Sequence, residues 1–117
     1  MPYVDGYLIP IPKKNLKAYA AMARLGARTW RKHGALDYKE CVADDLKPAW
    51  GLSFGAPLKR KPGETVVFSY VVFKSRAHRD RVNAKVLEEL SKSKAPKKMP
   101  FDIKRMVYGG FRVLVSG

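Results

Sequence analysis

The chain has 117 residues, one cysteine and no apolar run long enough to cross a membrane, so neither a disulfide scaffold nor a membrane-spanning protein is expected. Its length and 46% hydrophobic content predict one folded domain over residues 1–117. Lys and Arg total 24 against 10 Asp and Glu, and the net charge of +14 favours anionic partners. The single Cys41 and the lack of a signal peptide indicate a cytoplasmic protein.

The first part of the chain predicts a strand and then a helix. Tyr3–Ile11 alternates between two faces, and prolines, which cannot donate to a β-ladder, close it. A helix is expected over Lys14–His33, ended by Gly34, with Gly26 allowing a close approach of another element on its apolar face. Beside that face runs a cationic stripe, formed by Lys13, Lys17, Arg24, Arg28 and Arg31.

The next part predicts a second strand over Ala35–Ala43, in which Cys41 is expected to be a small buried residue. The following stretch, Leu46–Glu64, is rich in Pro and Gly and is long for a structureless loop. It is either a functional or dimer-clasping loop, or it contains a short edge strand around Gly51–Phe54.

Thr65–Lys74 is the longest β-prone run of the chain, and neither of its alternating faces is polar. One face carries Val66, Phe68, Tyr70 and Val72, and the other carries Val67, Val71 and Phe73. The chain's own helices can cover one of these faces, and the other needs a second sheet. A second copy of the chain would supply that sheet, so a homodimer is expected, with either face as the contact.

The last part predicts a second helix over Arg76–Ser93, capped by Ser75, with Val82, Val86, Leu87 and Leu90 on its apolar face. A basic connector, Lys92–Pro100, leads to a final strand over Met106–Val115. The order of elements is that of a ferredoxin-like βαββαβ protomer, an α+β fold whose antiparallel sheet carries both helices on one face.

Several long stretches resemble the YbaA-like family of short uncharacterised bacterial proteins, a domain-of-unknown-function family. They are Tyr3–Gly6, His33–Leu36 with Glu40–Asp45, Pro62–Phe68, Phe73–Asp80, and Met99–Asp102 through Arg105–Met106 to Tyr108–Phe111. The resemblance spans nearly the whole chain. It implies ferredoxin-like protomers that pair as a dimeric α/β barrel, and it implies no known reaction.

Two polar residues, Arg79 and Asn83, lie one turn apart on the apolar side of the second predicted helix. A guanidinium there needs a partner. If an acid such as Asp5 or Glu40 is within hydrogen-bond distance, the pair is structural. If the pair instead opens onto a cavity with no acid in reach, an anionic ligand is the expected occupant.

His33, Tyr7, Tyr70 and Tyr108 add polar tips to packed elements and could line such a cavity, although most buried Tyr and His residues only satisfy one hydrogen bond. No metal-ligand spacing, phosphate loop or activated nucleophile is recognisable, so no cofactor is expected. These residues favour a homodimeric small-molecule-binding domain, and the fold class by analogy allows a cofactor-independent enzyme.

The alternative function is a non-enzymatic basic module that binds nucleic acid or another polyanion. The cationic stripe, Lys59–Lys61, Lys94, Lys97 and Lys98 could follow phosphates. The aromatic residues, however, lie mostly at expected core positions and are not interleaved with the basic runs. A solvated basic surface is therefore the preferred explanation of the charge, and nucleic acid is a possible but not a favoured partner. No membrane partner is expected.

Overall fold

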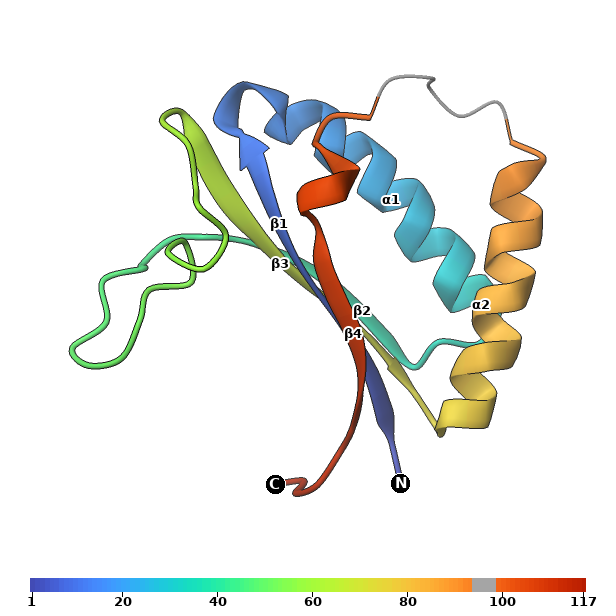
Figure 1. The fold of residues 1–117 in the computed structure, drawn as a ribbon. Coiled ribbons are helices and arrows are strands. Elements are labelled where there is room, and N and C mark those ends of the chain that lie inside the picture. Colours follow the sequence, from blue (N-terminus) through green and yellow to red (C-terminus); the bar gives the residue numbers. More distant parts are fainter. Residues whose placement is uncertain (94–98) are drawn as a thin grey trace.

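A computed structural model describes residues 1–93 and 99–117 and shows an α+β fold with two helices and a four-stranded antiparallel sheet (Figure 1). The elements are β1 (Tyr3–Pro12), η1 (Lys13–Asn15), α1 (Leu16–Lys32), β2 (Asp37–Val42), β3 (Glu64–Phe73), α2 (Arg76–Ser91), η2 (Ile103–Arg105) and β4 (Val107–Arg112). The strand order is β2-β3-β1-β4. Figure 1 shows α1 and α2 together on one face of the sheet.

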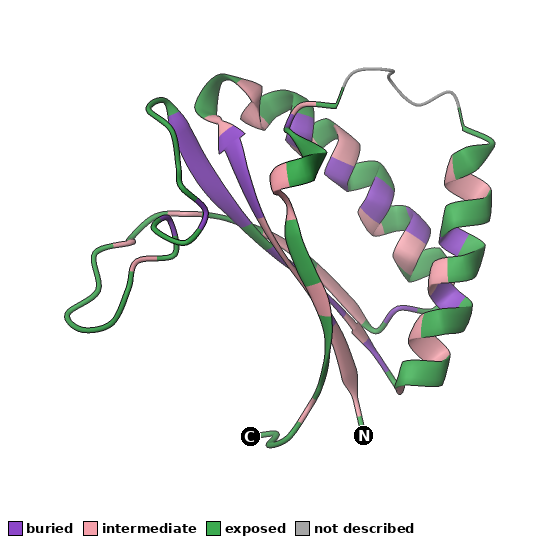
Figure 2. Ribbon diagram, viewed as in Figure 1, coloured by how far each residue is buried: buried purple, intermediate pink, exposed green. Residues whose placement is uncertain are grey.

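The strand predicted over Thr65–Lys74 is confirmed as β3, and it pairs with β1 from Tyr3↔Phe73 to Pro12↔Glu64. Its alternation decides which side chains reach the helices. Val67, Val71 and Phe73 lie on the helix face and are buried at 0 to 2% exposure, and they pack with Val82 and Val86 of α2 or with Ile9 of β1. Figure 2 shows buried residues along the strands and on the inner side of both helices.

The other face of the sheet carries Val66, Phe68, Tyr70 and Val72 of β3. Phe68 is 41% exposed and Phe111 of β4, on the same face, is 61% exposed. The segment 43–63 lies on this side of the sheet (Figure 1), where Phe54 packs against Phe68 at 6.3 Å between ring centroids. The helices therefore cover the face with Val67, and an apolar surface remains open on the opposite face.

The ends of the elements follow their local chemistry. Ser75 caps α2 as predicted, because its hydroxyl accepts a hydrogen bond from the backbone N–H of His78 at 3.1 Å. Gly34 follows α1 with a φ of 115°, as expected of a glycine that ends a helix. The cationic stripe beside the apolar face of α1 is exposed throughout. No helix in the described residues is long and apolar enough to cross a bilayer.

Several predictions from the sequence are corrected. Gly51–Phe54 forms bends and turns rather than an edge strand, because Gly51 has a φ of 82° that an extended strand cannot use. Cys41 is exposed rather than buried, because its side chain lies on the open face of β2. The last strand ends at Arg112 instead of Val115, where β1 offers no further partner beyond Tyr3.

The second helix also differs from its prediction. Its last residue is Ser91, and Leu87 is 66% exposed although it was placed on the apolar face. Within α2 only Val82 and Val86 are buried, so the face that the helix packs against the sheet is narrower than the predicted apolar face. Of the connector predicted over Lys92–Pro100, residues 94–98 with Lys94, Lys97 and Lys98 lie outside the described part of the chain.

Candidate functional site

A cavity of about 400 Å³ lies between the helix face of the sheet and the two helices. Residues from every strand except β4 line it, together with α1, α2 and the stretch from Met99 to Met106. Five aromatic side chains form much of the wall: Tyr7, Tyr19, Trp30, Tyr38 and Phe101. Leu87, Met99 and Ile103 also line the cavity and are each more than a third exposed, so the cavity reaches solvent beside α2 and η2.

One carboxylate, that of Glu40, lies in this otherwise mostly apolar wall. Strand alternation places Glu40 on the helix face of β2, opposite Ser69 of β3 and two residues from Tyr38. The Tyr19 hydroxyl donates to Glu40 Oε1 at 2.7 Å and lies 2.9 Å from Oε2. The Tyr38 hydroxyl donates to Oε2 at 3.3 Å. Two phenols from different elements therefore converge on one carboxylate.

Burial governs the acidities in this cluster. It raises the pKa of the Glu40 carboxyl above its ordinary value, and the hydroxyls of Tyr19, Ser69 and Tyr38 act in the opposite direction. Burial and the neighbouring Glu40 raise the pKa of Tyr19 and Tyr38 well above that of free tyrosine. Burial and Asp5 raise the pKa of Tyr7 to about 12. The three tyrosines are therefore neutral hydroxyl donors at physiological pH.

Gly26 makes the cluster geometrically possible. A Cβ atom at this position would lie 3.0 Å from the Tyr38 hydroxyl and 3.4 Å from the Trp30 ring. The absence of a side chain lets the phenol of Tyr38 pass beneath α1, as the sequence predicted for a close approach at Gly26. Trp30 and Tyr38 then pack at 5.8 Å between ring centroids.

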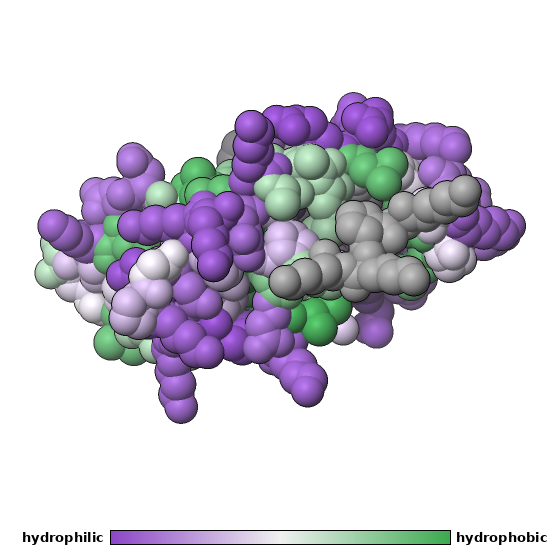
Figure 3. All heavy atoms as spheres, turned by 90° about the horizontal axis from the view of Figure 1, so that it is seen from above, coloured by the Kyte–Doolittle hydropathy of each residue, from purple (hydrophilic) through white to green (hydrophobic). Residues whose placement is uncertain are grey.

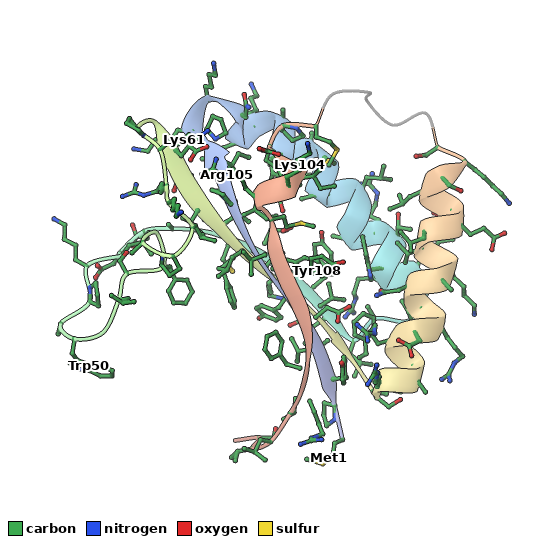
Figure 4. The ribbon with its side chains drawn as sticks, in the orientation of Figure 1. Met1, Trp50, Lys61, Lys104, Arg105 and Tyr108 are labelled. Atoms are coloured by element: carbon green, nitrogen blue, oxygen red, sulfur yellow. The ribbon has the colours of Figure 1, made fainter. Side chains whose placement is uncertain are left out.

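The exposed side of the cavity is held by an ion pair at η2. Arg105 bonds Glu64 with both terminal nitrogens, at 2.7 Å to Oε2 and 3.0 Å to Oε1, and the backbone N–H of Lys61 donates to the same carboxylate at 2.8 Å. Figure 4 labels Arg105 and Lys61. This bidentate contact lowers the pKa of Glu64 to about 2. It fixes the turn between Ile103 and Met106, both of which line the cavity.

Arg79 and Asn83 share one carboxylate, that of Asp5, which is buried on β1. Arg79 Nη1 lies 2.8 Å from Asp5 Oδ1, and Asn83 Nδ2 donates to Asp5 Oδ2 at 3.1 Å. The Asn83 oxygen accepts from Trp30 Nε1 at 3.0 Å. The Arg79 guanidinium also lies 4.9 Å from the centre of the Tyr3 ring. The expected acidic partner is therefore present, which favours the structural role, and a ligand-binding role for this pair stays a prediction.

The other candidate residues are spread over the molecule. Tyr7 lines the cavity, and Tyr108 stacks on it at 5.8 Å from β4, where Figure 4 labels it. His33 lies 3.0 Å from Glu89 at the end of α1. Tyr70 lies on the open face of the sheet, next to Phe68. Of the six, the structure brings only Tyr7 to the cavity wall.

Sequence reasoning missed the residues that give the cavity its polarity, namely Glu40 with Tyr19. The signal was present for Glu40, because it alternates with Tyr38 and Val42 in a predicted strand and so shares their face. Within residues 1–93 and 99–117, no group of three or more His, Cys, Asp or Glu side chains could hold a metal ion. The cavity wall offers apolar contact surface and one hydrogen-bonding carboxylate.

Comparisons with known proteins identify relatives of this chain. A family model described as "Protein of unknown function (DUF1428)" matches residues 2–103. The chain is 36% identical over 116 residues to the uncharacterized protein YbaA of Escherichia coli strain K12, with 99% of each chain covered, and equally so to YbaA of Shigella flexneri. A solved structure, the de novo designed protein Foldit4, is similar with a TM-score of 0.43 and 12% identity over 95% of this chain and 94% of that chain. The chain therefore belongs to the DUF1428 family.

Proposed function

We propose that this protein is a small-molecule-binding domain whose ligand occupies the cavity between the helices and the sheet. The main support for this proposal is the cavity itself, which has a volume of about 400 Å³, aromatic and aliphatic walls, and the carboxylate of Glu40. Small-molecule sites have this composition, since apolar walls supply affinity and a few polar groups fix orientation. A polar group with a perturbed pKa inside such a cavity is a further mark of a functional site.

The same site is compatible with cofactor-independent catalysis. A carboxyl group with a raised pKa can accept a proton from a bound molecule near neutral pH and return it. The neighbouring Tyr19 hydroxyl supplies a hydrogen bond to the carboxylate at 2.7 Å. Binding is the function proposed here, and a proton-transfer activity would be built on it.

The domain is further proposed to be a ferredoxin-like protomer that pairs as a dimeric α/β barrel in the cytoplasm. The strand order β2-β3-β1-β4, with both helices on one face, supports the ferredoxin-like arrangement. The exposed Phe68 and Phe111 on the other face support pairing through the open side of the sheet. The lone free thiol of Cys41 is suited to a reducing compartment.

Binding of the neutral, environment-sensitive dye prodan tests the cavity. We expect saturable binding of one dye per chain with a blue-shifted emission. Leu90→Trp fills the cavity from α2 and should weaken binding about tenfold or more, the equivalent of roughly 1.4 kcal/mol. Lys85→Trp adds the same ring at an exposed position on the same helix and should change nothing. Equal binding by both variants, or none by the unmodified protein, would overturn the proposal.

The polyanion-binding alternative has one observation in its favour, the fully exposed cationic stripe along α1. In Figure 3 hydrophilic side chains project over much of the face seen from above. Binding of generic RNA that falls steeply with salt would favour this alternative, because released counterions drive such binding. Binding of an uncharged ligand that is insensitive to salt favours the cavity.

A further inference from the structure

The partly buried carboxylate of Glu40 has hydroxyl donors but no cationic partner within residues 1–93 and 99–117. Its oxygens accept from Tyr19 at 2.7 Å and from Tyr38 at 3.3 Å. In the described residues, 1–93 and 99–117, the ion pairs of the protein lie elsewhere, and none includes Glu40. A partly buried carboxylate of this kind costs free energy unless a positive charge approaches it.

The hydrogen-bond geometry favours the charged form of Glu40 over the neutral acid. In the described part of the chain, the side chains that hydrogen-bond Glu40 all do so through hydroxyls: Tyr19 from α1, Tyr38 from β2 and Ser69 from β3. Hydroxyls that converge on both oxygens solvate a carboxylate. Two oxygens offer about four acceptor positions, so capacity for a further donor remains.

The walls around this carboxylate are suited to an organic cation. Tyr7, Tyr19, Trp30, Tyr38 and Phe101 present aromatic rings to the same cavity. The face of an aromatic ring attracts a cation, and rings grouped around a carboxylate are the usual means of holding an ammonium group. The Arg79 guanidinium, whose charge acts to lower the pKa of Tyr7 in the cavity wall, is already paired with Asp5 at 2.8 Å. The overall charge of +14 acts from the surface, where salt screens it beyond roughly 8 Å.

We infer that the cavity accepts a small hydrophobic amine in its ammonium form, with the nitrogen at Glu40 and the apolar part among the aromatic rings. This inference rests on the proposed function, because it names the chemical class of ligand for the same cavity. The raised pKa of Glu40 is consistent with it, since burial raises this pKa and no cation among the described residues offsets the effect.

Three probes of the same size separate charge from shape: phenethylamine, 2-phenylethanol and phenylacetate. Trp50 lies at the end of the loop in Figure 4 and is 87% exposed. Binding is measured in the Trp50→Phe variant, in which the fluorescence comes from Trp30 in the cavity wall. We expect phenethylamine to bind about 10- to 100-fold more tightly than 2-phenylethanol, as for a hydrogen bond to a charged group, and phenylacetate to bind most weakly.

Glu40→Gln is the matched variant, because glutamine keeps the shape and an acceptor for Tyr19 while removing the charge. In the Glu40→Gln variant, the affinity for phenethylamine should fall to that for 2-phenylethanol. The affinity for 2-phenylethanol itself should stay within about twofold of its value in the unmodified protein. If Glu40→Gln does not fold, the relative affinities of the unmodified protein for the three probes still test the inference. Equal affinities for amine and alcohol, or tightest binding of phenylacetate, would overturn the inference while prodan binding leaves the proposed function standing. If prodan binds but none of the three probes does, the inference also fails. If prodan fails too, both fail.

Discussion

At the scale of single residues, the partly buried guanidinium of Arg79 is balanced by a chain of side-chain contacts that joins β1, α2 and α1. Asp5 on β1 accepts from Arg79 and from Asn83 on α2, and Asn83 accepts from Trp30 on α1. Three elements are thereby joined through side chains, and Arg79 also bonds the exposed Asp80 at 2.8 Å through Nε. Such a network fixes the position of α2 relative to the sheet, and with it one wall of the cavity.

The first prediction concerns this network. Arg79→Met leaves the buried Asp5 carboxylate without its cation and should lower the free energy of unfolding by about 3–5 kcal/mol, measured in urea. Arg76→Met, on the exposed side of the same helix, should change it by less than about 0.5 kcal/mol. A normally stable Arg79→Met protein that has lost ligand binding would contradict the structural role and favour the binding role.

This network could be anticipated from the sequence because a charge on an apolar helix face demands a partner of opposite charge. Asp5 was one of two acids within plausible reach. The cluster around Glu40 could not be anticipated in the same way, because its members come from α1, β2 and β3 and are held together by hydroxyls rather than by an ion pair. Hydroxyl partners carry no pattern of charge or period that a sequence reveals.

At the scale of elements, β4 depends on a glycine that leaves room for a ring. A Cβ atom at Gly110 would overlap the Tyr3 ring, whose face also packs against the Arg79 guanidinium. Gly110 lies opposite Asp5 in the ladder, so the space above it is occupied by the network that begins at β1. The edge strand and the core network are therefore coupled through Tyr3.

The second prediction tests that coupling. Gly110→Ala should displace the Tyr3 ring and lower the free energy of unfolding by about 1–3 kcal/mol. The neighbouring Gly109→Ala is the control, because its Cβ would meet Phe111 at an ordinary 3.8 Å on the other face of the sheet. Thermal unfolding of both variants gives the comparison. Equal stability of the two variants would show that Tyr3 moves away without cost.

The bounds of an element could be predicted most closely where its apolar residues recur at a regular spacing. β3 was expected over Thr65–Lys74 and spans Glu64–Phe73, since its alternation is continuous over ten residues. The stretch Leu46–Glu64 left two interpretations open, because Gly and Pro indicate that the chain turns but not which element it packs against. Leu87 was placed in the core by its spacing, yet α2 meets the sheet through a narrower stripe and leaves Leu87 at the mouth of the cavity.

At the scale of the whole molecule, the open face of the sheet has no cover of its own beyond segment 43–63 in the described residues (Figures 1 and 2). The third prediction is that the protein sediments as a dimer, with twice its 13.2 kDa mass. Phe68→Glu places a charge on the exposed apolar face and should shift the protein to monomer or unfold it. Ala18→Glu, exposed on α1, should leave the dimer intact. A stable monomer of the unmodified protein at micromolar concentration would contradict this prediction.

One end of β1 has a consequence for how the chain behaves in a crowded solution. The β1–β4 ladder stops at Leu8↔Val107, whereas β1 and β3 stay paired as far as Pro12↔Glu64, so the stretch from Ile9 to Pro12 is flanked on one side only. Pro10 and Pro12 lie two apart and have no N–H, so this stretch has no unpaired donor at these two positions, and Ile9, Pro10 and Ile11 are themselves buried at 3% exposure or less. An extended peptide, or a partly folded copy of the chain, therefore cannot readily pair with this stretch as an additional strand. The two prolines thus make the margin of a highly apolar strand a poor seed for aggregation.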